Sequence, residues 1–237
     1  MERIQKQELL DLDDGSPEDV ASSLRSLRWI NCFFGGNRMH KRMLQQVRRS
    51  IPAHRLEILE VASGHATVLQ SAAKKLQQQH IELRILLLDR SDQHLPKPAD
   101  WDSSLPEPTL IHGNALHIPL PDHSVDVVSC CLFLHHLEEG EARAFLQEAL
   151  RVSRVAVLIN DLERGRIHYY LSRLAALVDP SRFNRHDGPA SVCKSYTPAE
   201  LRHLLQDTGC QYTLQRGFLY RMGGIAWRSS PGTTATA

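Results

Sequence analysis

Short apolar runs alternate with segments of helical periodicity through the middle of the chain, and this rhythm restricts the possible folds most strongly. Residues 56–61, 83–88 and 155–159 are short apolar runs typical of buried strands. Between them, residues 67–79 and 141–152 carry apolar side chains at helical spacing. Strand, helix and strand in this order form βαβ units, so we expect a parallel sheet with helices on both faces.

Further strands are predicted at residues 110–113 and 125–133. Residues 211–216 and 222–228 read as a terminal antiparallel pair. The sequence therefore predicts an α/β fold of the Rossmann-like type. We expect a three-layer αβα sandwich around a seven-stranded, mostly parallel sheet whose last strand is antiparallel.

The flanking segments suggest three parts. Residues 1–52 are expected to form an N-terminal helical lid, with its first 15 residues loosely ordered and Ser16 capping the first helix. Residues 53–228 are the predicted main domain, which includes a helix inserted after residue 164 that supplies a second wall. The tail, residues 229–237, is predicted to be disordered.

Composition excludes several classes of protein. Lys and Arg number 28 against 27 Asp and Glu, and a net charge of +1 is low for a nucleic-acid binder. No apolar run is long enough to cross a bilayer, and the N-terminus lacks the apolar region of a secretory signal. Five cysteines without a CxxC pair indicate reduced thiols, a cytoplasmic protein and no metal site.

The loop after the first predicted strand holds small residues that let a ligand approach the backbone. Two templates compete there. A dinucleotide site, G-x-G-x-x-G, would place Ala62, Gly64 and Thr67 at its glycine positions. The template acidic-x-G-x-G-x-G of S-adenosylmethionine sites fits better, because Glu60 supplies the acid and Ala62, Gly64 and Ala66 are all small.

Three other strand ends carry side chains suited to a nucleoside ligand. Asp89 ends the second strand, where a carboxylate can accept both hydroxyl groups of a ribose. Residues 113–115 follow the third strand and offer a polar side chain and backbone N–H groups to an adenine edge. The fourth strand ends near Leu132, and His135 and His136 follow it, where a methyl donor and acceptor would meet.

With these stretches taken together, the chain resembles the class I S-adenosylmethionine-dependent methyltransferases. It is most similar to the type 11 group of small-molecule enzymes that includes ubiquinone and menaquinone biosynthesis methyltransferases. The resemblance rests on ILEVASGHA (58–66), LD (88–89), GNA (113–115), LPD with VDVV (120–122 and 125–128, taken as one motif) and LHHL (134–137). Five motifs in the family's order over about half of the chain make this resemblance fairly specific.

The resemblance implies S-adenosyl-L-methionine as cofactor, S-adenosyl-L-homocysteine as product and a small hydroxylated aromatic, quinone-like or polyketide-like acceptor. It places cofactor contacts at Glu60, Ala62, Ser63, Gly64, Asp89, Arg90, Gly113, Asn114, Ala115 and Leu132. The sequence departs from the family pattern where Ala62 and Ala66 replace glycines and Asn114 replaces an aspartate. The alanines are compatible if they avoid positive φ, and the amide oxygen of Asn114 can still accept from an adenine amine.

An oxygen acceptor must lose a proton, and histidine is the natural base near neutral pH. His135, His136 and the pair His186-Asp187 are the candidates. Each has a structural alternative: the first two can simply fix their loop, and residues 187–189 form a strong turn signal. The aromatic side chains Trp29, Phe33, Phe34, Tyr169 and Tyr170 are expected to line an apolar acceptor pocket, and the core of the lid is an equal alternative for Phe33 and Phe34.

Other functions remain possible on this scaffold. An RNA or protein methyltransferase is disfavoured by the low net charge and by the lack of an Asn/Asp-Pro-Pro-Tyr motif. A nicotinamide-dependent reductase is disfavoured by Thr67 at the third glycine position. The two alanines also leave open a cofactor-binding protein without activity.

Overall fold

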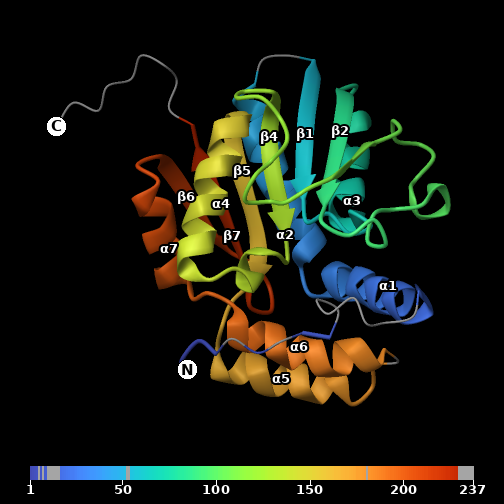
Figure 1. Cartoon of the computed structure of the whole chain (residues 1–237), viewed down its shortest axis with the longest axis vertical. Helices are drawn as coiled ribbons and strands as arrows, with labels where there is room; N and C mark the ends of the chain where they lie inside the picture. The colour runs from blue at the N-terminus through green and yellow to red at the C-terminus, as the bar shows by residue number, and fades with distance from the viewer. Residues whose placement is uncertain (5, 7, 10–16, 52–53, 180, 229–237) are drawn as a thin grey trace.

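The computed structural model describes residues 1–4, 6, 8–9, 17–51, 54–179 and 181–228. Its helices and strands follow each other in the alternating order expected of a βαβ protein (Figure 1). The elements are α1 (Pro17–Phe33), α2 (Gly36–Arg49), β1 (Arg55–Val61), α3 (Thr67–Gln77), β2 (Glu82–Asp89), β3 (Thr109–His112), β4 (Val125–Cys131), α4 (Glu139–Val152), β5 (Ser153–Leu162), α5 (Arg166–Ala176), α6 (Arg182–Lys194), α7 (Pro198–Asp207), β6 (Gln211–Arg216) and β7 (Arg221–Trp227).

The strands form one seven-stranded sheet in the order β3-β2-β1-β4-β5-β7-β6. The strands β3, β2, β1, β4 and β5 pair in parallel, whereas β7 runs antiparallel to both of its neighbours. The predicted Rossmann-like fold, with its antiparallel last strand, is confirmed. Strand order reverses between β1 and β4, the position at which sheets of this kind bind ligands.

Two apolar cores lie on opposite faces of the sheet and alternate along each strand, as the pleat requires. On one face, Ile58 of β1 packs in a cluster with Met43 of α2 and with residues of α3. On the other face, Val61 of β1 packs in a cluster with Phe145 of α4 and with residues of α7. Because α2 belongs to the core, α1 is the helix that remains, among the described part of residues 1–52, to act as a lid.

Three helices, α1, α5 and α6, cover the carboxyl ends of the strands at the lower end of the view in Figure 1. The cap is tied together by polar contacts between distant segments: Ser23 Oγ of α1 donates to Asn184 Oδ1 of α6 at 2.7 Å. No helix in the described part of the chain is long and apolar enough to cross a bilayer.

One prediction about local structure is wrong. Residues 187–189 do not form a turn, because α6 continues through Pro189. The helix persists since Phe183, Ala190 and Val192 are buried, and this packing outweighs the backbone hydrogen bond that a proline cannot make. By contrast, the expected capping of α7 by Thr197 is confirmed.

The described residues at the start of the chain make specific contacts with the rest of the molecule. Arg3 donates through Nη2 to the carbonyl of Leu137 at 2.6 Å, and its guanidinium lies 3.9 Å from the centre of the Tyr196 ring. Glu8 is 5% exposed. Residues 1–4 and 8–9 therefore lie against α6 and the loop after β4. The predicted cap at Ser16 and the tail 229–237 lie outside the described residues.

Candidate active site

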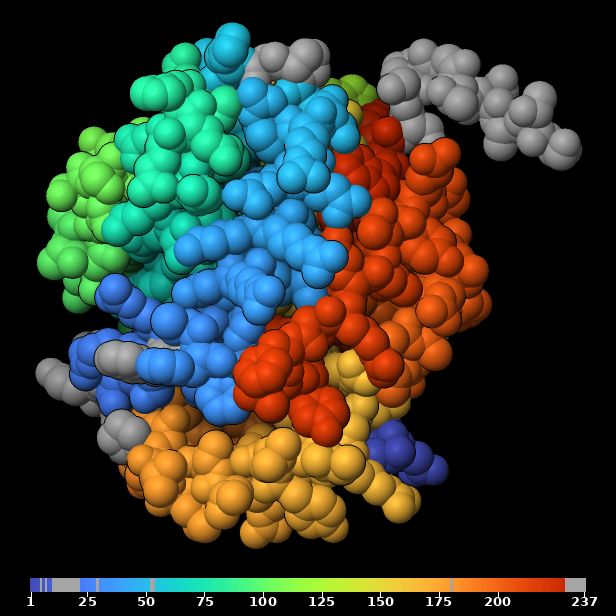
Figure 2. Space-filling view, turned by 180° about the vertical axis from the view of Figure 1, so that it is seen from behind, coloured from blue at the N-terminus to red at the C-terminus, as the bar shows by residue number. Residues whose placement is uncertain are grey.

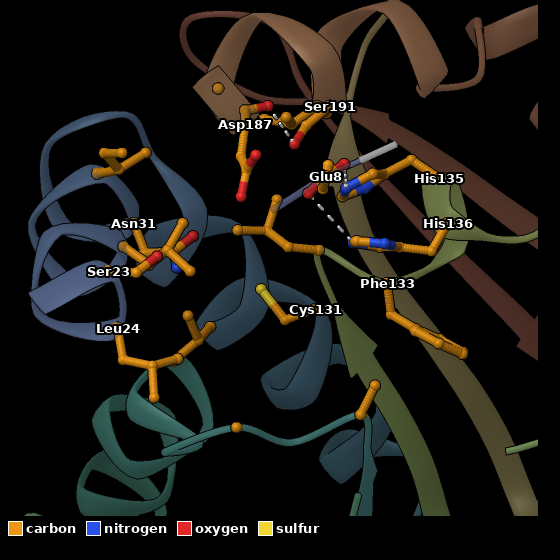
Figure 3. Close-up of a pocket in the computed structure, with 18 of the residues that line it drawn as sticks. Glu8, Ser23, Leu24, Asn31, Cys131, Phe133, His135, His136, Asp187 and Ser191 are labelled. Atoms are coloured by element: carbon orange, nitrogen blue, oxygen red, sulfur yellow. Dashed lines mark hydrogen bonds and ion pairs between the residues drawn. The ribbon is translucent and has the colours of Figure 1, made fainter. Parts of the chain in front are cut away.

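A single cavity of about 590 Å³ opens where the strands end and the cap begins, within the usual volume of small-molecule sites. Figure 3 shows Ser23, Leu24 and Asn31 of α1 on one side and Glu8, His135 and His136 on the other. The ten cofactor positions predicted from the sequence all line this cavity: Glu60, Ala62, Ser63, Gly64, Asp89, Arg90, Gly113, Asn114, Ala115 and Leu132.

The loop between β1 and α3 is built from alternating left-handed residues. Ala62, Gly64 and Ala66 have φ angles of 50°, 46° and 49°. The expectation that the two alanines avoid positive φ is therefore wrong. Each alanine costs about 1 kcal/mol in this conformation, and such strain persists only where the surrounding structure enforces it. Both alanines line the cavity wall, so their methyl groups leave it open.

Asp89 joins the ends of β1 and β2. The N–H of Gly64 donates to its Oδ2 at 3.0 Å, and the N–H of Ser91 donates to its Oδ1 at 3.2 Å. His94 Nδ1 lies 3.6 Å from the same Oδ1. Burial alone would raise the pKa of this carboxyl, but the contacts with His94, Gly64 and Ser91 outweigh it and lower the pKa. Asp89 is thus an anion, and a carboxylate has lone pairs left to accept from hydroxyl groups.

Asn114 is less available than predicted. Its side-chain oxygen accepts from the N–H of Leu116 at 2.9 Å, which closes a turn after β3. The amide oxygen keeps one lone pair, so a bond from an adenine amine must share this acceptor. Gly113 has little room for a side chain, because a Cβ there would lie 3.2 Å from Pro119 Cδ.

Glu60 occupies the acidic position of the loop motif, and its side chain is almost fully buried. Ser129 Oγ of β4 donates to its Oε2. Burial raises the pKa of Glu60 to about 7, against the smaller opposing effect of the Ser129 hydrogen bond. A cation or N–H donor brought close to Glu60 by a ligand would favour its ionised form.

His135 is held as a cation. Its Nδ1 lies 2.7 Å from Asp161 Oδ1 at the end of β5, and its Nε2 lies 3.6 Å from Glu8 Oε1. Burial alone would lower the pKa of this imidazole, but the charges and hydrogen bonds of Asp161 and Glu8 raise it to about 9. An imidazolium cannot accept a proton, so the geometry argues against the predicted role of His135 as a base.

His136 lies beside this pair and faces the cavity. Its ring centre is 4.2 Å from that of His135, and its Nδ1 lies 3.3 Å from Lys194 Nζ of α6. Its Nε2 is 3.8 Å from Glu8 Oε2 (Figure 3). His136 therefore stays as the candidate base, positioned between an ammonium and a carboxylate.

Glu8, His135 and His136 also present ligand atoms within 4.8 Å of one another, a spacing that suits a metal ion. The same carboxylate lies 3.1 Å from Lys194 Nζ. Burial alone would raise the pKa of Glu8, but His135, His136 and Lys194 lower it well below its usual range. The charge of the Glu8 carboxylate is thus already balanced by His135 and Lys194. The expectation that this site holds no metal stays a prediction.

Of the remaining sequence candidates, some line the cavity and others do not. His186 does not line the cavity among the described residues, although Asp187 does. Its Nδ1 lies 2.8 Å from Asp187 Oδ1, which also accepts from the N–H of Leu9. Of the five aromatic candidates, Phe34 lines the cavity. Phe33, Tyr169 and Tyr170 do not, and the side chain of Trp29 lies outside the described part of the structure.

Sequence reasoning missed Glu8, Lys194 and Asp161, which set the charge around the two histidines. Asp161 lies near the carboxyl end of the buried strand β5, at the same sheet edge as Asp89, so its position was a usable signal. Glu8 and Lys194 lie far from the motifs in sequence and had no such signal. Cys131 also faces the cavity, but burial raises the pKa of its thiol to about 12, which makes it a poor nucleophile.

Comparison with known proteins supports the scaffold. Residues 58–155 match the family model described as a methyltransferase domain. No curated protein matches the chain.

Solved structures share the fold at low sequence identity. A SAM-dependent methyltransferase from Aquifex aeolicus has a TM-score of 0.59 and 17% identity, covering 90% of this chain and 99% of its own. The plantazolicin methyltransferase BpumL, in complex with a monoazolic desmethylPZN analog and SAH, has a TM-score of 0.67 and 12% identity over 86% of this chain and 89% of its own. Magnesium protoporphyrin IX methyltransferase from Synechocystis PCC 6803 with bound SAH has a TM-score of 0.54 and 14% identity over 82% and 84%.

Proposed function

We propose that this chain is a class I S-adenosylmethionine-dependent methyltransferase, because residues 58–155 match the model of a methyltransferase domain and solved methyltransferases share the fold. We propose that it methylates an oxygen or carbon of a small, largely apolar molecule of the hydroxylated aromatic, quinone-like or polyketide-like kind. Residues 53–228 are the proposed catalytic domain. The five cysteines are free thiols, which fits the reducing cytoplasm that we propose as its location.

One observation carries this proposal: a single cavity contacts both the cofactor loop and a mainly apolar cap. Its wall includes Gly64 and Asp89 at one end and Leu27, Ile30 and Val192 of the cap helices. A donor and an apolar acceptor can therefore lie in contact within the same cavity, out of bulk water.

The residues present fit the cofactor. Asp89 is an anion at the place where a ribose diol needs acceptors, and the left-handed loop around Gly64 lets the backbone approach a ligand. Above Gly64 a Cβ would meet only Leu24 Cδ2, at 3.6 Å, so the loop is not crowded. S-adenosylmethionine supplies a methyl group activated by a sulfonium, and the chain's own task is to bind, orient and deprotonate.

In this proposal Nδ1 of His136 takes the proton of an oxygen acceptor, whose hydroxyl displaces the Lys194 ammonium from that nitrogen, while Nε2 keeps its N–H toward Glu8. Glu8 and Lys194 hold its ring from two sides, and the His135 imidazolium beside it adds positive charge near the developing anion. An acceptor that is already an ionised phenolate needs this base less. The oxygen and carbon reactions therefore differ in how strongly they depend on His136.

The test combines binding and turnover. Calorimetry should show S-adenosylmethionine binding and no binding of NADPH; the reverse result excludes a methyltransferase. Turnover is then measured with apolar hydroxylated aromatic acceptors and with transfer RNA, and methylation of the RNA alone would favour the RNA enzyme.

The His136→Ala variant should slow methylation of a neutral phenol roughly 10²-fold, since a general base contributes about that much. His203→Ala, an exposed histidine of α7, is the matched control and should react at the normal rate. If His136→Ala retains near-normal turnover and the same pH dependence, His136 is structural.

A further inference from the structure

The helix α5 exposes large apolar side chains on its outer side. Ile167, Tyr170 and Leu174 of α5 are 65%, 69% and 64% exposed, and Leu177, which caps the end of the helix, is 77% exposed. None of the residues of α5 is buried. We name these four residues the α5 stripe. Soluble proteins seldom leave so many neighbouring apolar side chains in water unless the surface binds something.

The α5 stripe is continuous along one face of the helix. Its members are spaced by three, four and three positions, which places them above one another on a helix surface. Figure 1 shows α5 as the outermost helix of the cap, and Figure 2 shows residues of this part of the chain, in gold, forming the lower end of the molecule. The stripe can therefore meet a flat surface without obstruction from the sheet.

The same helix, together with Val178 just beyond its end, also lines the cavity. Leu171 and Val178 both line the cavity, yet they are 43% and 83% exposed. Inner neighbours on α5, Ser172 and Ala175, line the cavity too. An apolar path thus runs from the outer surface of α5 into the proposed acceptor site.

Basic side chains border the stripe. Arg166 and Arg173 are exposed on α5, and Arg182 and Arg185 are exposed on the neighbouring α6. The carboxylate of Asp179 is half-buried between them and accepts from Ser26 Oγ and the N–H of Ser181. Four exposed guanidinium groups beside an apolar helix face suit a surface that is apolar inside and anionic outside.

We propose that the α5 stripe docks on an anionic phospholipid surface, so that the cavity mouth opens toward the bilayer. This rests on the proposed function and narrows it, because the acceptor would then be a lipophilic molecule dissolved in the membrane. Tyr170 sits well at such an interface, with its ring in the apolar layer and its hydroxyl near the headgroups. A second copy of the chain fits less well, since a symmetric contact through the stripe would set arginines against arginines.

The experiment is sedimentation of the full chain with sucrose-loaded vesicles, of phosphatidylcholine alone and of phosphatidylcholine with 30% phosphatidylglycerol. The chain should pellet with the anionic vesicles, and partitioning should fall at least tenfold in high salt. The double variant Leu174→Ser and Leu177→Ser should reduce partitioning at least tenfold, as should Arg166→Gln combined with Arg173→Gln. Leu110→Ser, on an exposed leucine of edge strand β3, is the matched control and should pellet normally.

The proposal is overturned if the chain pellets with neither kind of vesicle. It is also overturned if Leu110→Ser reduces partitioning as much as the stripe variants do. A dimer in light scattering that the stripe variant dissociates, without vesicle binding, assigns the stripe to a second copy instead. Calorimetry with S-adenosylmethionine on the same samples separates the two ideas. If the chain pellets but does not bind S-adenosylmethionine, the docking surface is supported and the proposed function is rejected. If the chain binds S-adenosylmethionine but never pellets, the proposed function is supported and the docking surface is rejected.

Discussion

Asp89 shows how one side chain can organise a site before any ligand arrives. It accepts from backbone N–H groups on both sides of the cavity floor, those of Gly64 and Ser91, and so fixes the β1 loop relative to the end of β2. The charge that would bind a ribose is therefore also the charge that positions the loop. A substitution that removes the carboxylate of Asp89 therefore removes both the ribose acceptor and the contact that positions the loop.

Replacing Asp89 by alanine should weaken S-adenosylmethionine binding by about 1–3 kcal/mol, through lost hydrogen bonds to the ligand and a loosened loop. Calorimetry measures the dissociation constant directly. Asp92→Ala, a nearby exposed carboxylate, serves as the control. An unchanged dissociation constant for Asp89→Ala would refute its role.

His135 gives the stability of the protein a defined pH dependence. Its folded pKa of about 9 lies above the ordinary value of 6.5, so its contribution is complete below pH 6.5 and is lost as pH rises through 9. The free energy of unfolding should fall by on the order of 2 kcal/mol more in the wild type than in His135→Gln between pH 7 and 10. Urea unfolding at several pH values measures this difference, and parallel profiles for the two proteins would contradict it.

At the scale of elements, the N-terminal segment acts as part of the cavity wall rather than as a loose extension. Arg3 binds the carbonyl groups of Leu137 and Lys194, and Glu8 lies between two cations. Ile4 adds a backbone bond to Cys193 of α6. These contacts join Arg3, Ile4 and Glu8 to the loop that carries His136 and to α6.

Deleting residues 1–9 should raise the KM for the acceptor at least fivefold while leaving the dissociation constant of S-adenosylmethionine within about threefold. The reason is that Glu8 forms ion pairs with His135 and His136 on the acceptor side, whereas the donor site is built around Gly64 and Asp89. Deleting the nine residues 229–237 is the length-matched control. Equal effects on donor and acceptor would show that the deletion damages the whole fold.

At the scale of the whole molecule, the sheet and the cap both line the cavity, so a ligand that contacts both should stabilise the whole fold. S-adenosylhomocysteine at 100 times its dissociation constant should add about 2.7 kcal/mol to the free energy of unfolding. For a chain of this size that corresponds to a rise in Tm of roughly 5–10 °C. Thermal unfolding with and without the ligand tests this, and an equal rise with NADPH would point to a different cofactor.

Much of the fold was predictable because its signals are local. The apolar runs of β1, β2 and β5 and the capping box at Thr197 appear within a few residues of sequence. Helix α6 was not fully predictable, since Gly188 and Pro189 favour a turn locally and only the packing of Phe183 and Val192 keeps the helix intact.

The sequence by itself determined which strand ends face the cavity, because strand direction and small-residue loops follow from periodicity and residue type. Only the tertiary structure decided the charge states there. Asp161 and Glu8 make His135 a cation from positions distant in sequence, and burial makes Glu60 a weak acid. A pKa depends on which charges lie within a few ångströms and on how much water is excluded, and neither quantity is encoded in neighbouring residues.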